Sequence, residues 1–147
     1  MLRFRRCPIA AQTTSPTSQA QRVAAARQFA IDAARLASHT RGHNVVILDL
    51  QDLSPITDFF VLVTGTSARQ MRTVLDEIIE FGEPRGFKTI GTNGKDSEQW
   101  MLADFVDVVV HVFSQDARQY YDLDGLWGDA KRVEWEQETG DGAASGR

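Results

Sequence analysis

A short apolar run, a tight turn and a capped amphipathic helix constrain the fold of this chain more than any other feature. Residues 59–63, FFVLV, have the length of a buried strand and the β-branched and aromatic side chains that strands favour. Thr64-Gly65-Thr66 ends the run, and Ser67 with Gln70 matches a capping box that starts a helix. The apolar residues of that helix recur at helical spacing: Met71, Val74, Leu75, Ile78 and Ile79. Such a unit predicts a sheet with helices packed on it.

The rest of the chain adds further elements to this unit. An alanine-rich helix is expected at 20–40, with Gly42 as its C-terminal stop. Pro84 must end or kink the helix that starts at Ser67, because proline lacks an N–H group. The other expected elements are strands at 45–50, 87–90, 100–103 and 108–112, turn residues at 91–98, and a helix at 115–121 capped by Ser114.

The expected order of elements is therefore α-β-β-α-β-β-β-α. The fold class is α/β (α+β), with a mixed five-stranded sheet and helices packed on it. The strands at 59–63 and 87–90 would form a right-handed crossover if they pair in parallel, and the remaining strands would pair as hairpins.

The length of 147 residues suits one domain with one core. We expect a disordered extension at 1–19, the folded domain at 20–138 and a disordered tail at 139–147. The extension is rich in arginine and free of acids, a composition that is also typical of organellar transit peptides. We favour a plain extension and a cytoplasmic protein, with a mitochondrial or plastid location as the alternative. No apolar run reaches the roughly 18 residues of a membrane helix.

Charge is distributed unevenly along the chain. Residues 1–31 carry five arginines and no acid, whereas the chain from Asp32 onward carries 20 acids and 11 bases. An acidic domain is a poor ligand for phosphate groups, so no direct nucleic-acid specificity is expected. A basic protein is the better partner for such a domain.

Residues for chemistry are sparse. Gly65-Thr66-Ser67 could be a phosphate-binding turn, but a turn followed by an N-cap explains the same residues. Asp58, Asp104 and Asp107 are the only carboxylates at strand ends that could hold Mg²⁺, and no Asp-x-Asp pair lies in a strand. A metal site of His39, His43, His111 and Cys7 is not expected, because Gly42 interrupts the helix and His111 lies in an apolar strand. We expect no cofactor and no metal.

Large aromatic residues gather in the second half of the chain. Tryptophan and tyrosine are enriched at the centres of protein interfaces. Tyr120 and Trp127 are expected to close the core. For Trp100, which follows a polar loop, both an interface role and a core role remain open.

Three segments in order resemble the Iojap-like ribosomal silencing factors. Residues 56–61, ITDFFV, lead into TGTSARQ at 64–70, which is similar to the strand–turn–helix of that family. WMLAD at 100–104 precedes DVVVHVF at 107–113, like the paired late strands of the family, and RQYYDLDGLW at 118–127 resembles its closing helix. Val106 stands where many members carry glycine, which implies a turn that needs no positive φ.

The resemblance implies a nucleotidyltransferase-like fold without a working set of catalytic carboxylates. Members of the family bind the large ribosomal subunit through a ribosomal protein, the universal protein fourteen, and block subunit joining when nutrients are short; organellar members assist large-subunit assembly. By motif, the resemblance implies Trp100, Leu102, Asp104 and Asp107 as the residues that bind the partner. The free protein could form a homodimer. The alternative function is a divergent nucleotidyltransferase that uses Gly65, Ser67 and the aspartates with Mg²⁺.

Overall fold

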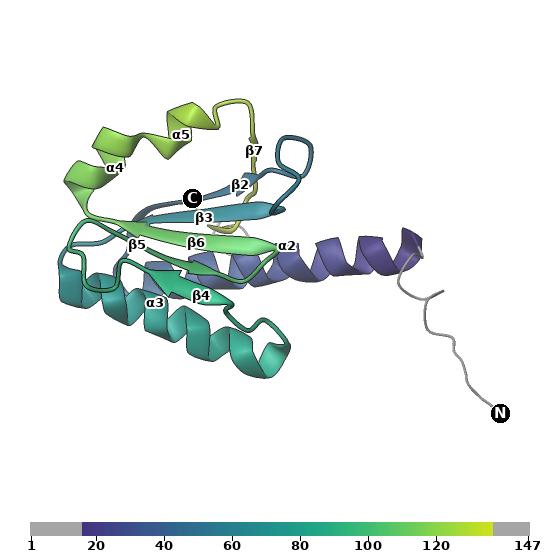
Figure 1. Cartoon of the computed structure of the whole chain (residues 1–147), viewed down its shortest axis with the longest axis horizontal. Coiled ribbons are helices and arrows are strands. Elements are labelled where there is room, and N and C mark those ends of the chain that lie inside the picture. The colour runs from purple at the N-terminus through teal and green to yellow at the C-terminus, as the bar shows by residue number, and fades with distance from the viewer. Residues whose placement is uncertain (1–15, 137–147) are drawn as a thin grey trace, which may run out of the picture.

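A computed structural model describes residues 16–136 of the chain (Figure 1). Most of the expected N-terminal extension, the expected tail at 139–147 and Cys7 lie outside the described residues. None of the described helices is both long enough and apolar enough to span a membrane. The elements in chain order are α2 (Pro16–His39), β2 (His43–Asp49), β3 (Phe59–Thr64), α3 (Ala68–Gly82), the 3₁₀ turn η1 (Glu83–Arg85), β4 (Gly91–Asn93), β5 (Trp100–Asp104), β6 (Val108–Phe113), α4 (Gln115–Tyr121), α5 (Leu123–Leu126) and β7 (Lys131–Arg132).

The described strands form one mixed sheet in the order β4-β5-β6-β3-β2-β7. The two central strands, β3 and β6, run parallel, and every other neighbouring pair is antiparallel. The expectation of a mixed sheet with helices on it is confirmed, with six strands instead of five. The predicted parallel pair was wrong, because β3 pairs with β6 and not with residues 87–90.

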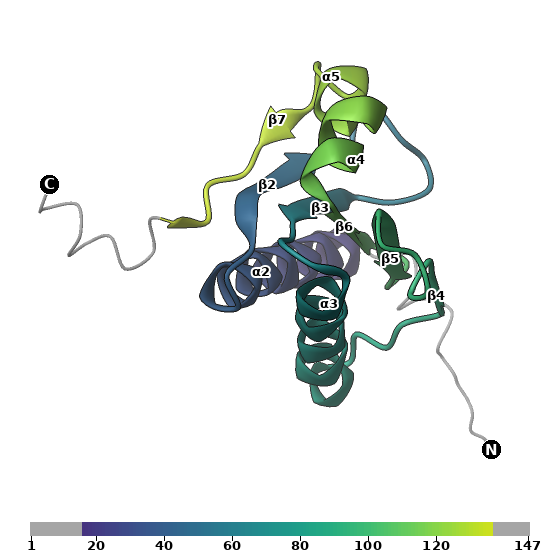
Figure 2. The ribbon, with the colours of Figure 1, turned by 90° about the vertical axis from the view of Figure 1, so that its left-hand side faces the viewer.

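Helices cover both faces of the sheet, which separates two apolar cores (Figure 1, Figure 2). α2 and α3 lie on one face, where they bury Val61, Val108, Val110 and other small aliphatic side chains in the larger core. α4 and α5 lie on the opposite face, over β2, β3 and β6, and cover a smaller core around Leu62 and Phe113. The apolar run at 59–64 is continuous because the two faces of this central strand pack against different helices.

The helix boundaries follow local hydrogen bonds. Ser67 caps α3 by accepting from the backbone N–H of Gln70, as expected, while Gln70 accepts from Thr66 N and not from Ser67 N. α2 begins at Pro16, four residues before the expected start. At its end, Arg41 takes the left-handed conformation with φ 72, and Gly42 N donates to Ala37 O. Gly42 therefore takes part in the C-terminal stop as expected, although Arg41 and not the glycine is the left-handed residue.

Two edge strands were not predicted correctly. The expected strand at 87–90 is irregular, and the strand β4 lies at 91–93, inside the segment interpreted as turn residues. β7 was missed altogether, because Lys131 and Arg132 carry no strand signal and pair with β2 through backbone contacts. The chain continues along β2 beyond β7, where Val133 N donates to Ile47 O and Trp135 Nε1 donates to Val45 O.

The hairpin between β5 and β6 contradicts the expected turn. Val106 has φ 77, so this β-branched residue occupies the left-handed region that glycine favours. Asp104 Oδ1 accepts from Val106 N at 2.8 Å and stabilises the turn locally. The inference that valine at this position excludes a positive φ was wrong.

Candidate docking face

The alternation of β5 brings three of the four proposed partner-binding residues together. Trp100, Leu102 and Asp104 point to the face of the sheet opposite α2 and α3 and are half-buried, whereas Met101 and Ala103 between them are fully buried in the larger core. Alternation of side chains along a strand is the reason for this division.

The register of the neighbouring strands extends this face. Leu102 lies beside His111, and Asp104 lies beside Val109, which in turn lies beside Phe60 of β3. Val109 and Phe60 are half-buried, because α4 and α5 cover only part of this side of the sheet. The docking face, as we call it, consists of Phe60, Trp100, Leu102, Asp104 and Val109. Sequence reasoning missed Phe60 and Val109, since only the strand register shows that they belong to it.

Trp100 belongs partly to this face and partly to the smaller core. Its ring lies 5.1 Å from that of Phe113 and 4.6 Å from that of Tyr121, between ring centroids. Its Nε1 donates a hydrogen bond to Nδ1 of His111 at 3.1 Å. The tryptophan is therefore packed on one side and partly exposed on the other, so both roles left open by the sequence apply to it.

His111 is buried beneath the docking face, with only 5% of its surface exposed. Burial lowers the pKa of its imidazole to about 4, so the ring is neutral at physiological pH. Because Nδ1 accepts from Trp100, the proton lies on Nε2, which has no hydrogen-bond partner among the described residues. His111 is thus a core residue with one of its two ring nitrogens hydrogen-bonded among the described residues.

α4 and α5 are held against the sheet by a buried arginine. Arg118 forms a two-pronged ion pair with Asp124, at 2.9 and 3.0 Å, and its Nη1 donates to Thr64 Oγ1. The hydrogen bonds from Arg118 hold the pKa of Asp124 below its usual value. This anchor places the ring of Tyr121 against Trp100, with 44% of Tyr121 exposed. Tyr120 is 81% exposed, so the expectation that it closes the core was wrong.

Asp107 does not join the other three proposed residues. It lies in the β5–β6 hairpin, and its carboxylate is 3.9 Å from Nη2 of Arg22 on α2, which covers the other face of the sheet. Its backbone oxygen accepts from the N–H groups of Asp58 and Phe59. Burial raises the pKa of Asp58, and the nearby carboxylate of Asp107 raises it further. The position of Asp107 therefore fits a role in closing this end of the sheet.

The turn at Gly65 opens into a crevice at the C-terminal ends of the parallel strands. The crevice has a volume of about 620 Å³ and includes Gly65, Thr66, Ser67, His43 and Glu98 in its lining. No lysine or arginine of residues 16–136 lines it, which makes it a poor phosphate site. Within residues 16–136, no three histidine, cysteine or acidic side chains converge where a metal ion could bind. His39 lies at the end of α2 and His43 at the start of β2, while His111 lies under the docking face.

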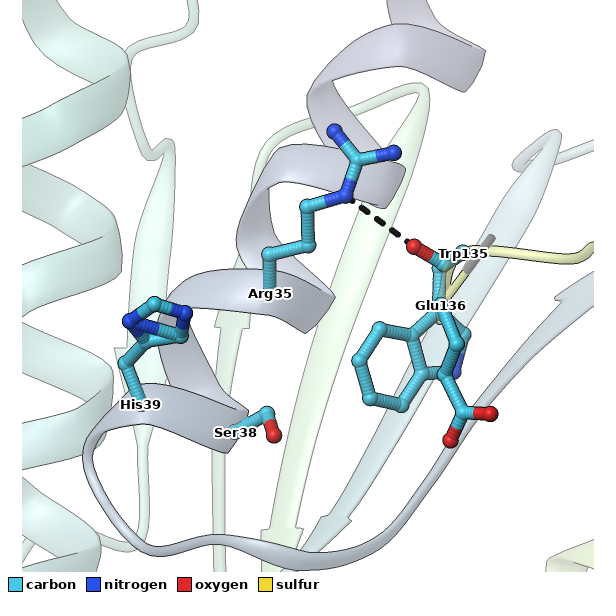
Figure 3. Close-up of a pocket in the computed structure, with 5 residues that line it drawn as sticks. All are labelled: Arg35, Ser38, His39, Trp135 and Glu136. Atoms are coloured by element: carbon cyan, nitrogen blue, oxygen red, sulfur yellow. Dashed lines mark hydrogen bonds between the residues drawn. The ribbon is translucent and has the colours of Figure 1, made fainter. Parts of the chain in front are cut away.

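A second cavity lies between α2 and the C-terminal segment (Figure 3). It has a volume of about 230 Å³ and is lined by Arg35, Ser38, His39, Trp135 and Glu136. Nε of Arg35 donates to the backbone oxygen of Trp135, and this bond ties the C-terminal segment to the helix. The cavity therefore lies along the contact between α2 and the C-terminal segment.

Comparison with known proteins identifies the family. The sequence profile described as "Ribosomal silencing factor during starvation" matches residues 23–146. The chain belongs to the ribosomal silencing factor family. A ribosomal silencing factor of Halalkalibacterium halodurans is 38% identical over 96 residues, which cover 65% of this chain and 82% of that protein. The resemblance drawn from the three sequence segments is thereby confirmed.

Two further comparisons give a similar mouse protein and a similar solved structure. A mouse protein named "Mitochondrial assembly of ribosomal large subunit protein 1" is 30% identical over 74 residues, 48% of this chain and 32% of that protein. A crystal structure from Chromobacterium violaceum superposes with a TM-score of 0.64 at 28% identity, covering 79% of this chain and 91% of the other.

Proposed function

We propose that this protein binds the large ribosomal subunit through a ribosomal protein, the universal protein fourteen, and sterically blocks association with the small subunit. Family membership supports a ribosomal role, and the name of the mouse relative points to the large subunit. The observation that carries the proposal is the docking face, a half-buried and mostly apolar strip of the sheet that α4 and α5 cover only in part. The protein acts as a bound obstacle and needs no catalytic step.

The composition of the docking face suits a protein partner. It offers aromatic and aliphatic side chains together with one carboxylate, Asp104, and exposed Asp116 and Asp122 lie at the two ends of the adjacent helix α4. Aromatic side chains at the centre of an interface contribute most of the affinity. Acidic groups around them favour a basic partner and accelerate the encounter.

A charge-neutral substitution tests this proposal on the folded protein. Asp104→Asn removes the negative charge but keeps an oxygen that can accept from Val106 N, so the hairpin stays intact. We expect it to weaken co-sedimentation with purified large subunits about tenfold, a loss typical of one charged pair at an interface. Leu102→Asp should weaken binding further, because it places a charge in the apolar strip.

The matched control is Glu80→Gln, which removes one charge from the exposed side of α3, far from the docking face. It should bind large subunits as the wild type does. A light-scattering assay of subunit joining should show the same order of effects. Wild-type protein that neither co-sediments with large subunits nor slows subunit joining would sink the proposal.

The nucleotidyltransferase alternative rests on the crevice at Gly65. Ser67 already caps α3, and the described residues that line the crevice include no lysine or arginine for a phosphate group. Calorimetric titration with Mg²⁺ and ATP decides the matter. Saturable binding at micromolar concentration that is lost in Ser67→Ala would favour the enzyme; we expect no binding in either protein.

We also propose the cytoplasm as the place of action. An organellar protein would instead lose its arginine-rich N-terminus on import. Mass spectrometry of the protein purified from its own cells distinguishes the two, since only import would leave a shortened N-terminus.

A further inference from the structure

A buried polar group beneath the docking face is unexplained by packing. His111 sits in an otherwise apolar layer between Phe60, whose ring centroid is 4.5 Å away, and Phe113, whose ring is stacked at 6.0 Å. Its Nε2–H has no hydrogen-bond partner in the described part of the chain. An unpaired buried donor destabilises a fold, so phenylalanine or leucine would suit this layer better. The polar contact that the histidine makes with a described residue should therefore account for its presence.

That contact is with Trp100, the residue of the docking face whose type is most typical of protein interfaces. In the register of β5 and β6, Trp100 lies beside Phe113 and Leu102 lies beside His111, so Trp100 and His111 are diagonal neighbours on one face. Aromatic side chains can reach each other across such a diagonal. Nε1 of Trp100 donates to Nδ1 of His111 at 3.1 Å, and only a neutral imidazole can accept there.

The hydrogen bond distinguishes two orientations of the indole. Phe113 and Tyr121 pack against the ring, but apolar contacts alone tolerate an indole turned over about its χ2 angle. Turning it would remove Nε1 from His111 and present a different ring edge to the outside. The imidazole of His111 cannot turn together with the indole, because the rings of Phe60 and Phe113 flank it.

We propose that His111 is a positioning residue that holds the indole of Trp100 in one orientation on the docking face and thereby sets the affinity for the large subunit. This inference rests on the proposed function. A side chain that is ordered before binding loses less entropy in the complex, which is worth about a three- to tenfold difference in Kd. His111 itself touches no partner, since it is buried.

Two substitutions separate the hydrogen bond from the packing. His111→Phe keeps an aromatic ring in the layer but removes the acceptor. His111→Asn returns an acceptor oxygen near the place of Nδ1. Leu48→Ala is the control, because it damages the same smaller core three strands away from β5. Thermal melting of each variant establishes that it is folded; should His111→Phe not fold, His111→Leu takes its place.

The first measurement is the indole N–H resonance of Trp100 in a ¹⁵N-labelled sample, assigned by its absence from Trp100→Phe. We expect slow exchange with solvent in the wild type and in Leu48→Ala, fast exchange in His111→Phe, and partial return of protection in His111→Asn. A resonance that stays protected in His111→Phe would overturn the proposal, because the hydrogen bond would then not hold the indole.

The second measurement is affinity for purified large subunits in a double-mutant cycle. His111→Phe should weaken binding three- to tenfold in the wild-type background and have no effect in Trp100→Phe, which has no N–H to donate. An equal loss in both backgrounds would show that His111 acts independently of Trp100 and would overturn the positioning role. If the wild-type protein does not bind large subunits, the proposed docking function is wrong. The indole resonance still shows in that case whether the hydrogen bond orders Trp100.

Discussion

Val106 shows how a single backbone position can be held against the preference of its side chain. A β-branched residue with φ 77 is strained, since its Cβ crowds the adjoining peptide groups. The hydrogen bond from Val106 N to Asp104 Oδ1 and the pairing of the flanking strands hold the turn in place. About half of the Val106 side chain is exposed, so little burial offsets the strain.

Replacing this valine with glycine should therefore stabilise the protein. We expect Val106→Gly to raise the free energy of unfolding by about 1 kcal/mol. Glycine relieves the backbone strain, and this gain exceeds the cost of the greater chain entropy that glycine gives the unfolded state. Urea denaturation measures it. Val106→Ala serves as the comparison, because it keeps Cβ and should recover only part of the gain. An unchanged or lowered midpoint for the glycine variant would show that the turn is unstrained.

His111 makes stability depend on pH. Its pKa is about 4 in the folded protein, whereas an exposed histidine of the unfolded chain titrates near 6.5. Between these values the unfolded chain binds a proton that the folded protein does not, so stability is full above about pH 6.5 and is lost as pH falls towards 4. The total loss from this group is about 3 kcal/mol.

We expect this loss to disappear in His111→Phe. Chemical denaturation at pH 7 and pH 4.5 should show a difference in unfolding free energy that is about 2–3 kcal/mol larger in the wild type than in the variant. Leu48→Ala, less stable but with His111 intact, should keep the wild-type difference. Parallel curves for the wild type and His111→Phe would mean that the histidine is not held neutral.

At the scale of elements, α4 and α5 depend on one buried cation. Arg118 is 9% exposed and joins three elements, since its partners are Thr64 at the end of β3 and Asp124 in α5. Removing one partner of a buried ion pair leaves the other without compensation. The same arrangement holds Tyr121 beside Trp100, so it also supports the docking face.

Arg118→Ala should lower the free energy of unfolding by about 3 kcal/mol. This loss lies at the lower end of the range for breaking a buried ion pair, because Asp124 is partly exposed. Arg118→Lys should recover little, since an ammonium group cannot make the two parallel bonds to the carboxylate. Thermal or urea unfolding measures both. A lysine variant as stable as the wild type would show that charge alone, and not the paired geometry, holds α4 and α5.

The sequence predicted those elements whose signal is local. The serine N-caps and the apolar patterns identified α3, α4 and the strands β3, β5 and β6, because burial and side-chain hydrogen bonds there follow from neighbouring residues. β4 and β7 were not predicted, since their exposed residues are strands only through backbone pairing with a neighbour. The same holds for the candidate site. The family resemblance named Trp100, Leu102 and Asp104 together with Asp107. The register of three strands was needed to add Phe60 and Val109 and to separate Asp107.

At the scale of the whole molecule, the described core begins well inside α2. Among the described residues, those of the two cores start at Val23, and Phe29 stacks on Phe87 at 4.4 Å and meets Phe105 at 5.0 Å. We expect removal of residues 1–15 to change the melting temperature by no more than about 3 °C, because no described core residue is lost.

Removal of residues 1–30 is the contrasting case. It deletes three fully or nearly fully buried residues, Ala26, Phe29 and Ala30, and should leave the protein unfolded, since loss of one buried phenylalanine alone costs about 3–5 kcal/mol. Circular dichroism during heating compares the two. A shorter protein that melts much earlier after loss of residues 1–15 would place part of the fold in the N-terminal segment.

The parallel pairing of β3 and β6 at the centre of the sheet has a kinetic consequence. The two strands are neighbours although α3, β4 and β5 all lie between them in the chain. The hairpins β2–β3 and β5–β6 close short loops and can form early, but they remain two separate halves until the central pair joins them. Contacts between distant segments form slowly, because a long loop must close before they contribute. We therefore expect the pairing of β3 with β6 to be the last step in the assembly of this sheet. Because this step first brings Val109 beside Phe60, the docking face should exist only once the chain has finished folding.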